Sequence, residues 1–353
     1  MKSIYLYLVP LIFIFNCNNN CNLVHLERAF YYWKSNEYVD DPYNISKLKE
    51  LMINKLYIKL FEVDYSETMG NFPYEKSTIF DIKSILKDSL EIIPTIFIKN
   101  GIFEFNDENS LNLLAENIHH LINKRVSESL DVDNNKNFKL DFNEIQIDCD
   151  WTKSTKDKYF YLLKKIKEIS KKKISCTLRL YPFKYQDQMG VPPVDKCMLM
   201  CYNLIKPLSQ KDKNSILDID ELNKYIDKPI SYPKHLDIAL PAFNWTQVYK
   251  NDKFTMLLDL TDKDFQKYTK PIRPMWFEIT EDTEIDYENY LRKGDQIKYE
   301  DVEATQIHEA ISVIKKNVQM DNDITISLFD LDQTTFKLYS NEEINSFYSA
   351  FAK

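Results

Sequence analysis

Glu144-Ile-Gln-Ile-Asp-Cys-Asp-Trp-Thr152 sets the architecture that the rest of the sequence follows. Polar and apolar side chains alternate along it, with Gln146, Asp148 and Asp150 on one face, which is the period of a β-strand. The Cα atoms of two residues that share a strand face lie roughly 6.5–7 Å apart. Two carboxylates this close in a buried strand cost free energy unless they are solvated, paired or protonated. We therefore predict a site at this strand end, the structural alternative being a solvated strand exit with Asp150 as a capping residue.

Apolar strands alternate with amphipathic helices along the rest of the sequence. Including the central strand at 144–151, we predict eight strands, the others at 28–34, 55–64, 91–98, 175–180, 196–202, 236–242 and 324–330. Helices are predicted at 44–53, 109–123, 156–171, 219–226, 305–316 and 341–351, with 78–86 read as a helix or a loop. This order is typical of parallel βα units, and eight strands close a barrel. We therefore predict an α/β fold, a single (β/α)8 TIM-type barrel, with a doubly wound open sheet as the alternative.

One segment interrupts the alternation between the predicted seventh and eighth strands. It contains Met275-Trp-Phe-Glu-Ile279 and Gln296-Ile-Lys-Tyr-Glu300, two short runs with strand character. We expect a small β insertion at about 250–303, inside a barrel domain that spans 23–353.

The first 22 residues have the pattern of a targeting signal. Lys2 precedes an apolar run from Ile4 to Phe15, which suits the core of a signal peptide better than a membrane-spanning helix. Cys17 follows with an Asn-rich tether, and this arrangement resembles a bacterial lipoprotein signal, in which the cysteine is lipidated. Asn16 departs from that family, where a small residue is usual. An ordinary secretory signal and an uncleaved anchor are the alternatives, and all three place the rest of the chain outside the cytoplasm. The lipoprotein resemblance implies a lipid anchor in the bacterial envelope, at the outer membrane or in the periplasm.

Composition excludes several classes of function. The formal charge is −8, which argues against nucleic acid as the main partner. The chain has only four glycines, which cannot supply a GxGxxG or P-loop phosphate cradle, so we predict no nucleotide cofactor. The cysteines within predicted strands are expected to be buried free thiols, and no histidine spacing indicates a metal site. We expect a monomer.

Polar and aromatic residues gather where the predicted strands end. In a (β/α)8 barrel these ends meet on one face, which carries the chemistry. The expected catalytic residues are Asp148 and Asp150. The expected substrate-binding residues are Trp33, Glu62, Trp151, Arg179, Tyr181, Tyr202, Asn203, Asn244, Trp245 and Asp330. Rings that stack on sugar faces, with acids and amides for hydroxyl groups, are typical of a carbohydrate pocket.

Three short motifs resemble the chitinase-like family-18 glycoside hydrolases. Ile147-Asp-Cys-Asp-Trp-Thr152 resembles the fourth-strand D-x-D-x-E motif, Leu199-Met-Cys-Tyr-Asn203 the sixth-strand M-x-Y-D motif, and Leu240-Pro-Ala-Phe-Asn244 the seventh-strand stretch. The resemblance implies a barrel over roughly 25–353 and a glycan as partner. Two positions depart from the family. Thr152 stands where the family has the glutamate that protonates the leaving oxygen, and Asn203 stands where it has an aspartate.

These departures leave three hypotheses open. The first is a glycoside hydrolase of the envelope that uses Asp148 and Asp150, with Glu62 or Asp330 as further candidate proton donors. The second is a degenerate barrel that binds a glycan without cleaving it, which a threonine at position 152 favours because its hydroxyl cannot serve as a general acid at neutral pH. The third is a transferase in which the two aspartates hold a divalent metal ion, and it lacks an accompanying phosphate-binding loop.

Overall fold

The computed structural model describes residues 25–34, 42–77, 90–128, 140–209, 211–285 and 289–352. The predicted signal segment, including Cys17, and the predicted element at 78–86 lie outside these ranges. Within them, no helix has the length and apolar character needed to cross a membrane.

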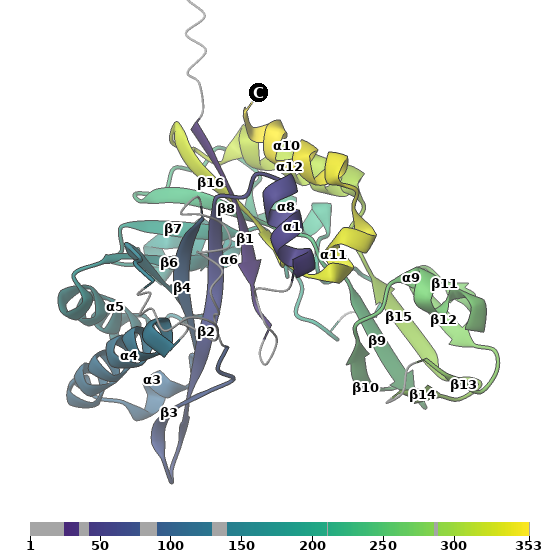
Figure 1. Ribbon diagram of the computed structural model, residues 1–353, viewed down its shortest axis with the longest axis horizontal. Helices are drawn as coiled ribbons and strands as arrows, with labels where there is room; N and C mark the ends of the chain where they lie inside the picture. The colour runs from purple at the N-terminus through teal and green to yellow at the C-terminus, as the bar shows by residue number, and fades with distance from the viewer. Residues whose placement is uncertain are drawn as a thin grey trace, which may run out of the picture.

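Eight parallel strands form a closed barrel (Figure 1). They are β1 (His25–Tyr32), β2 (Lys55–Ser66), β4 (Glu91–Ile98), β5 (Glu144–Asp148), β6 (Lys173–Arg179), β7 (Lys196–Met200), β8 (His235–Pro241) and β16 (Asp323–Phe329). Neighbours in the barrel follow the chain order, and β1 closes it by pairing with both β2 and β16. The predicted (β/α)8 barrel is confirmed. An antiparallel strand, β3 (Gly70–Tyr74), pairs with the end of β2 and extends it as a hairpin.

Helices connect the strands and cover the outside of the barrel. The longer ones are α1 (Pro42–Glu50), α4 (Glu108–Glu128), α5 (Lys156–Ser170), α8 (Ile219–Tyr225), α10 (Ala304–Asn317) and α12 (Asn341–Ala352). Shorter helices follow the strands at the rim: α3 (Ile102–Phe105), α6 (Leu180–Lys184), α7 (Gln186–Met189) and α11 (Gln333–Leu338). Figure 1 shows α4 and α5 side by side against the β4–β6 side of the barrel. The six predicted helices are all present, with ends that differ by a few residues.

Alternation along β5 places its two faces as the sequence indicates. Gln146 points into the barrel, where it accepts a hydrogen bond from the hydroxyl of Tyr31 on the opposite strand β1 at 2.7 Å. Ile147 is fully buried, and the Tyr159 hydroxyl of α5 donates to its carbonyl at 3.4 Å. The buried cysteines carry free thiols, as expected.

Charged side chains occupy the barrel interior near the strands' N-terminal ends. Lys196 of β7 lies 2.9 Å from Glu144 of β5 and 2.9 Å from Asp237 of β8. On the other side, Lys55 of β2 contacts Glu27 of β1 at 2.5 Å. Buried ions are stable only when they are paired and hydrogen-bonded. The charges at this end of the barrel meet that condition, so polar groups without a partner are to be sought at the opposite, C-terminal end.

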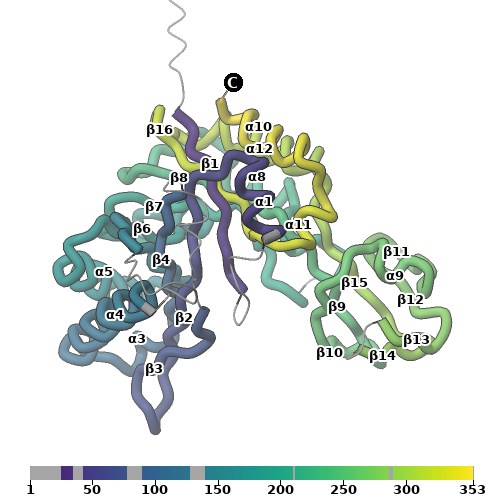
Figure 2. Tube along the Cα trace, in the orientation of Figure 1, coloured from purple at the N-terminus to yellow at the C-terminus, as the bar shows by residue number. Residues whose placement is uncertain are grey.

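A second sheet lies between β8 and β16 in the chain. It is antiparallel, in the order β10 (Lys253–Leu258), β9 (Trp245–Lys250), β15 (Gln296–Glu300), β12 (Trp276–Ile279) and β11 (Thr269–Arg273). The connections contain α9 (Asp262–Phe265), η1 (Gln266–Tyr268) and the small pair β13 (Thr283–Glu284) and β14 (Tyr290–Leu291). The tube in Figure 2 shows this sheet as a lobe at one side of the barrel.

Buried polar contacts tie this lobe to the loop that follows β7. Glu300 pairs with Lys298 in a fully buried position and also accepts a hydrogen bond from the hydroxyl of Ser215 at 2.6 Å. Lys298 donates to the carbonyl of Lys213 at 2.8 Å, and the indole of Trp276 donates to the carbonyl of Lys211 at 2.8 Å. The lobe and the post-β7 loop are therefore held together as one unit.

Candidate functional site at the rim of the barrel

Asp148 is the last residue of β5 and points into the barrel near its C-terminal end. Its side chain is buried, and its Oδ1 accepts a hydrogen bond from the hydroxyl of Thr177 on β6 at 2.5 Å. Burial raises the pKa of Asp148 to about 6, and the nearby charge of Asp150 acts in the same direction. Asp148 is thus a carboxyl group that changes protonation close to neutral pH.

Asp150 lies two residues beyond the observed end of β5, which is shorter than the predicted strand. Its exposed carboxylate forms a two-pronged ion pair with Arg179 at the end of β6. Arg179 Nε lies 2.7 Å from Oδ1, and Nη2 lies 3.2 Å from Oδ2. Such a planar guanidinium–carboxylate pair fixes both side chains in orientation. Asp148 and Asp150 therefore meet two different environments, one buried and the other paired with a cation.

Thr152 belongs to the turn that leads into α5. Its backbone N–H donates to the hydroxyl of Thr155 at 2.9 Å, and its own hydroxyl lies 2.9 Å from that of Ser154. These local side-chain contacts are typical of residues that precede a helix. The position that carries the proton donor in the resembling family is therefore part of a polar turn in this chain.

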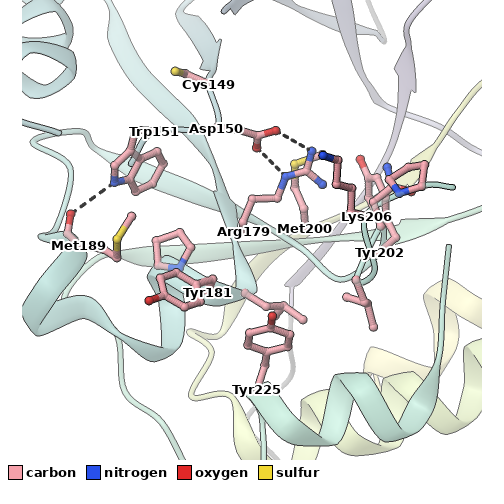
Figure 3. A pocket seen from close by; sticks show the side chains of 15 residues that line it. Cys149, Asp150, Trp151, Arg179, Tyr181, Met189, Met200, Tyr202, Lys206 and Tyr225 are labelled. Atoms are coloured by element: carbon pink, nitrogen blue, oxygen red, sulfur yellow. Dashed lines mark hydrogen bonds and ion pairs between the residues drawn. The ribbon is translucent and has the colours of Figure 1, made fainter. Parts of the chain in front are cut away.

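Two cavities open beside the Asp150–Arg179 pair (Figure 3 shows the larger). The larger has a volume of about 470 Å³ and the smaller about 190 Å³. Both are lined by Asp150, Arg179, Met200, Tyr202 and Asn203. The two cavities adjoin at these residues, and the larger falls within the roughly 300–1,000 Å³ typical of small-molecule sites.

The smaller cavity is lined by residues from several strand ends. Three of the residues expected at the rim contribute to it, namely Trp33, Glu62 and Asp148. Glu62 is held by buried Lys59 at 2.6 Å, and the Lys59 ammonium also lies 5.5 Å from the centre of the Trp33 ring. Glu62 therefore has a cationic partner in place.

Tyr202 and Asn203 at the end of β7 lie between the two cavities. Tyr202 is almost fully buried, yet its hydroxyl has no hydrogen-bond partner among the described residues, and neither has Oδ1 of Asn203. Asn203 adopts a left-handed backbone conformation (φ +52°), which asparagine tolerates better than most residues. Buried polar atoms are normally satisfied, so these two atoms are candidates for contact with a ligand.

The aromatic residues of the larger cavity differ in exposure. The Trp151 ring is buried and stacks on Tyr159 of α5 with ring centres 5.3 Å apart, while its N–H donates to the carbonyl of Met189 at 3.3 Å. Tyr181 is 47% exposed and packs against Tyr185 with ring centres 4.7 Å apart. Tyr181 thus has an open ring surface, whereas Trp151 mainly contributes packing.

Three predicted residues line neither cavity. The amide of Asn244 donates to the carbonyl of Leu260 at 2.6 Å, and Trp245 begins β9, so both belong to the base of the second sheet. Asp330 follows β16 at the rim. Burial raises the pKa of Asp330 to about 7, with the negative charges of Asp332 and Asp259 adding to the shift.

Sequence reasoning missed several residues of the larger cavity. Lys206 lies in the loop after β7, and Tyr225 ends α8. Met189 and Pro182 come from the short helices α7 and α6 after β6. Such residues carry no periodic signal, because loops and short helices place them through their tertiary packing.

Among the described residues, no group of three or more His, Cys, Asp or Glu side chains is arranged to hold a metal ion. The hypothesis of a metal held by Asp148 and Asp150 gains no support from the geometry, because Asp150 already has a cationic partner in Arg179.

Comparison with known proteins places the fold. No protein-family model and no curated protein matches the sequence. Among solved structures, the spore cortex-lytic enzyme SleL from Bacillus cereus aligns with a TM-score of 0.52 at 14% identity, covering 92% of this chain and 74% of that chain. A chitinase from Bacteroides thetaiotaomicron aligns with a TM-score of 0.48 at 10% identity, covering 91% of this chain and 96% of that chain. The resemblance to the chitinase-like family-18 proteins is thus confirmed at the level of the fold.

Proposed function

We propose that this protein binds a glycan at the C-terminal rim of its barrel and does not cleave it by the mechanism of the resembling hydrolases. The observation that carries the proposal is Thr152, which stands at the proton-donor position with its hydroxyl bound within a turn. A glycan suits the two cavities because they combine an open ring surface, at Tyr181, with unpartnered polar atoms on Tyr202 and Asn203. The glycoside hydrolase-like fold supports the same class of partner.

The ion pairs of Asp150 and Glu62 argue against hydrolysis by these two carboxylates. Glycoside hydrolysis needs one carboxyl group to give a proton and another to act as nucleophile or base. Asp150 is paired with Arg179, and Glu62 with Lys59. In both pairs a carboxylate oxygen already contacts a cation, so it is not free to act on a substrate.

Hydrolysis by another arrangement is the second candidate function, and one observation favours it. The pKa of Asp148 is about 6, which is the range that a general acid needs near neutral pH. Asp148 would donate the proton in such an enzyme, with a second carboxylate opposite.

Parallel binding and turnover measurements on one panel of oligosaccharides separate the two functions. We expect heat of binding by calorimetry and no release of reducing ends. Asp148→Asn and Tyr202→Phe should weaken binding, whereas Asp157→Asn, an exposed change in the first turn of α5, should not. Turnover that Asp148→Asn abolishes would replace binding by hydrolysis as the function. An absence of both binding and turnover across the panel would refute both candidates.

We also propose that the mature protein is a monomer, exported and anchored to the bacterial envelope through a lipid on Cys17. The supporting pattern is the apolar run from Ile4 to Phe15 with a cysteine directly after Asn16.

A further inference from the structure

The larger rim cavity has a charge of opposite sign to that of the whole chain. Of the 15 residues that line it, Asp150 is the only acid, whereas Arg179 and Lys206 are both cations. The chain as a whole carries a formal charge of −8. A positive cavity in an acidic protein attracts anions locally while the remaining surface repels them, so this local reversal of sign indicates a ligand with negative charge.

Arg179 balances the charge of Asp150 and still has one guanidinium nitrogen available to a ligand. Its Nε and Nη2 donate to the two oxygens of Asp150, and Nη1 donates to no group among the described residues. Burial disfavours the charge of Arg179, but the attraction of Asp150 outweighs it and raises the pKa above the usual range. The guanidinium therefore stays charged with a donor left for a ligand.

Lys206 supplies the second cation. Its side chain is exposed, and no carboxylate among the described residues pairs with it. In the view of Figure 3, the guanidinium of Arg179 lies between Asp150 and Lys206. Among the residues that line this cavity, Asp150 and Arg179 offset each other, and Lys206 is the remaining charge that a ligand carboxylate would balance. Asp148, whose charge also acts on Arg179, lines the adjoining smaller cavity.

We propose that the ligand of the larger cavity is a saccharide that carries a carboxylate, bound by Arg179 Nη1 and the Lys206 ammonium. This proposal rests on the proposed glycan-binding function and adds the class of sugar. Tyr181 and Tyr225, on the cavity wall, contact the sugar ring beside the carboxylate. A neutral sugar would leave the Lys206 ammonium and the Nη1 of Arg179 without a negatively charged partner. It would gain only from ring contacts and hydroxyl groups.

Two matched ligand pairs test the proposal with the full-length protein by calorimetry. The first pair is a disaccharide of N-acetylglucosamine and the same disaccharide with a lactyl ether, which adds one carboxylate. The second is cellotriose and its fully C6-oxidised counterpart. We expect the wild type to bind the carboxylated member of at least one pair about tenfold more tightly, the size of one charge-assisted hydrogen bond. Raising the salt concentration should reduce this preference.

Variants of Lys206 assign the preference to the cavity. Lys206→Gln should reduce it about threefold, as expected for an exposed charge, and Lys206→Glu should abolish it. Lys153→Gln is the matched control, because Lys153 is an exposed lysine near the same rim that does not line the cavity. Equal affinity within both pairs, or a preference that Lys206→Glu leaves unchanged, would overturn the inference while glycan binding stands. No binding to any of the four sugars, together with no binding in the wider oligosaccharide panel, would remove both.

Discussion

Replacing Asp148 by asparagine should stabilise the protein, and only at pH values where the carboxylate is ionised. Asp148 is buried at the end of β5 and has a pKa of about 6, against an ordinary value of 3.8. An asparagine at this position has the same shape and keeps an oxygen that can accept the hydrogen bond from Thr177. The substitution therefore removes a buried charge while it preserves the known contact.

The magnitude follows from the difference between the two pKa values. Below about pH 3 the carboxyl group is protonated in both states, so it contributes no pH-dependent term. Between 3.8 and about 6 the unfolded chain loses its proton first, and stability falls as the pH rises. Since one pKa unit corresponds to about 1.4 kcal/mol, the full cost above that range is about 3 kcal/mol. Asp148→Asn should therefore gain about 2.4 kcal/mol between pH 4 and pH 7.5, relative to wild type, because a small part of the effect is already present at pH 4.

Urea unfolding of both proteins at several pH values measures this difference directly. A difference in the free energy of unfolding that is the same at all pH values would reflect the unpaired amide of the new side chain. The relevant quantity is therefore how this difference changes with pH. Asp157→Asn, an exposed aspartate on α5, should stay within about 0.5 kcal/mol of wild type throughout. A free-energy difference for Asp148→Asn that is the same at pH 4 and pH 7.5 would refute the reasoning about this carboxylate.

Three further predictions concern the rim, the barrel and the anchor. Asp330→Asn should also gain stability relative to wild type as the pH rises from about 4 to 7, because burial raises the pKa of Asp330 to about 7. Its glycan affinity, measured by calorimetry, should not change, and a weaker affinity would place Asp330 in the site. Ile147→Asp should destabilise the barrel by about 4 kcal/mol or more in the same urea titration, because it buries an unpaired charge. The control Ile147→Val should cost about 1 kcal/mol. A melting temperature for Ile147→Asp within a degree or two of wild type would mean that β5 faces the other way. Radioactive fatty acid should label the wild type and not Cys17→Ser, and label that persists in the variant would move the lipid to Cys21 or exclude the lipoprotein assignment.

The barrel could be predicted from the sequence because each strand carries a strong local signal. Runs such as Leu56–Phe61 and Ile92–Ile98 are mostly apolar, as expected of strands covered by helices outside and by other side chains inside. The order of strands and helices then fixes the topology, because parallel neighbours need a helical crossover. The β2–β3 hairpin was not predicted, since β3 contains Pro73 and carries little strand pattern.

The rim site could be predicted only in part. Strand ends place Asp148, Arg179 and Tyr202 beside one another at the rim, because a strand's direction determines where its last residues lie. Pattern alone does not distinguish a ring that faces a cavity from one that packs on a helix, as Trp151 does on Tyr159. Lys206 was missed because a lysine in a loop resembles any solvated charge until the fold places it on a cavity wall.

Because buried contacts join the second sheet to the post-β7 loop, the second sheet can affect which ligand binds at the rim. The loop supplies Asn203 and Lys206 to the cavity wall, and its far end is fixed by Glu300 of β15 through Ser215. A substitution at Glu300 would thus shift the loop and alter which ligands fit, although Glu300 touches neither cavity. Substitutions in the second sheet could therefore change ligand preference without altering any residue of the eight barrel strands.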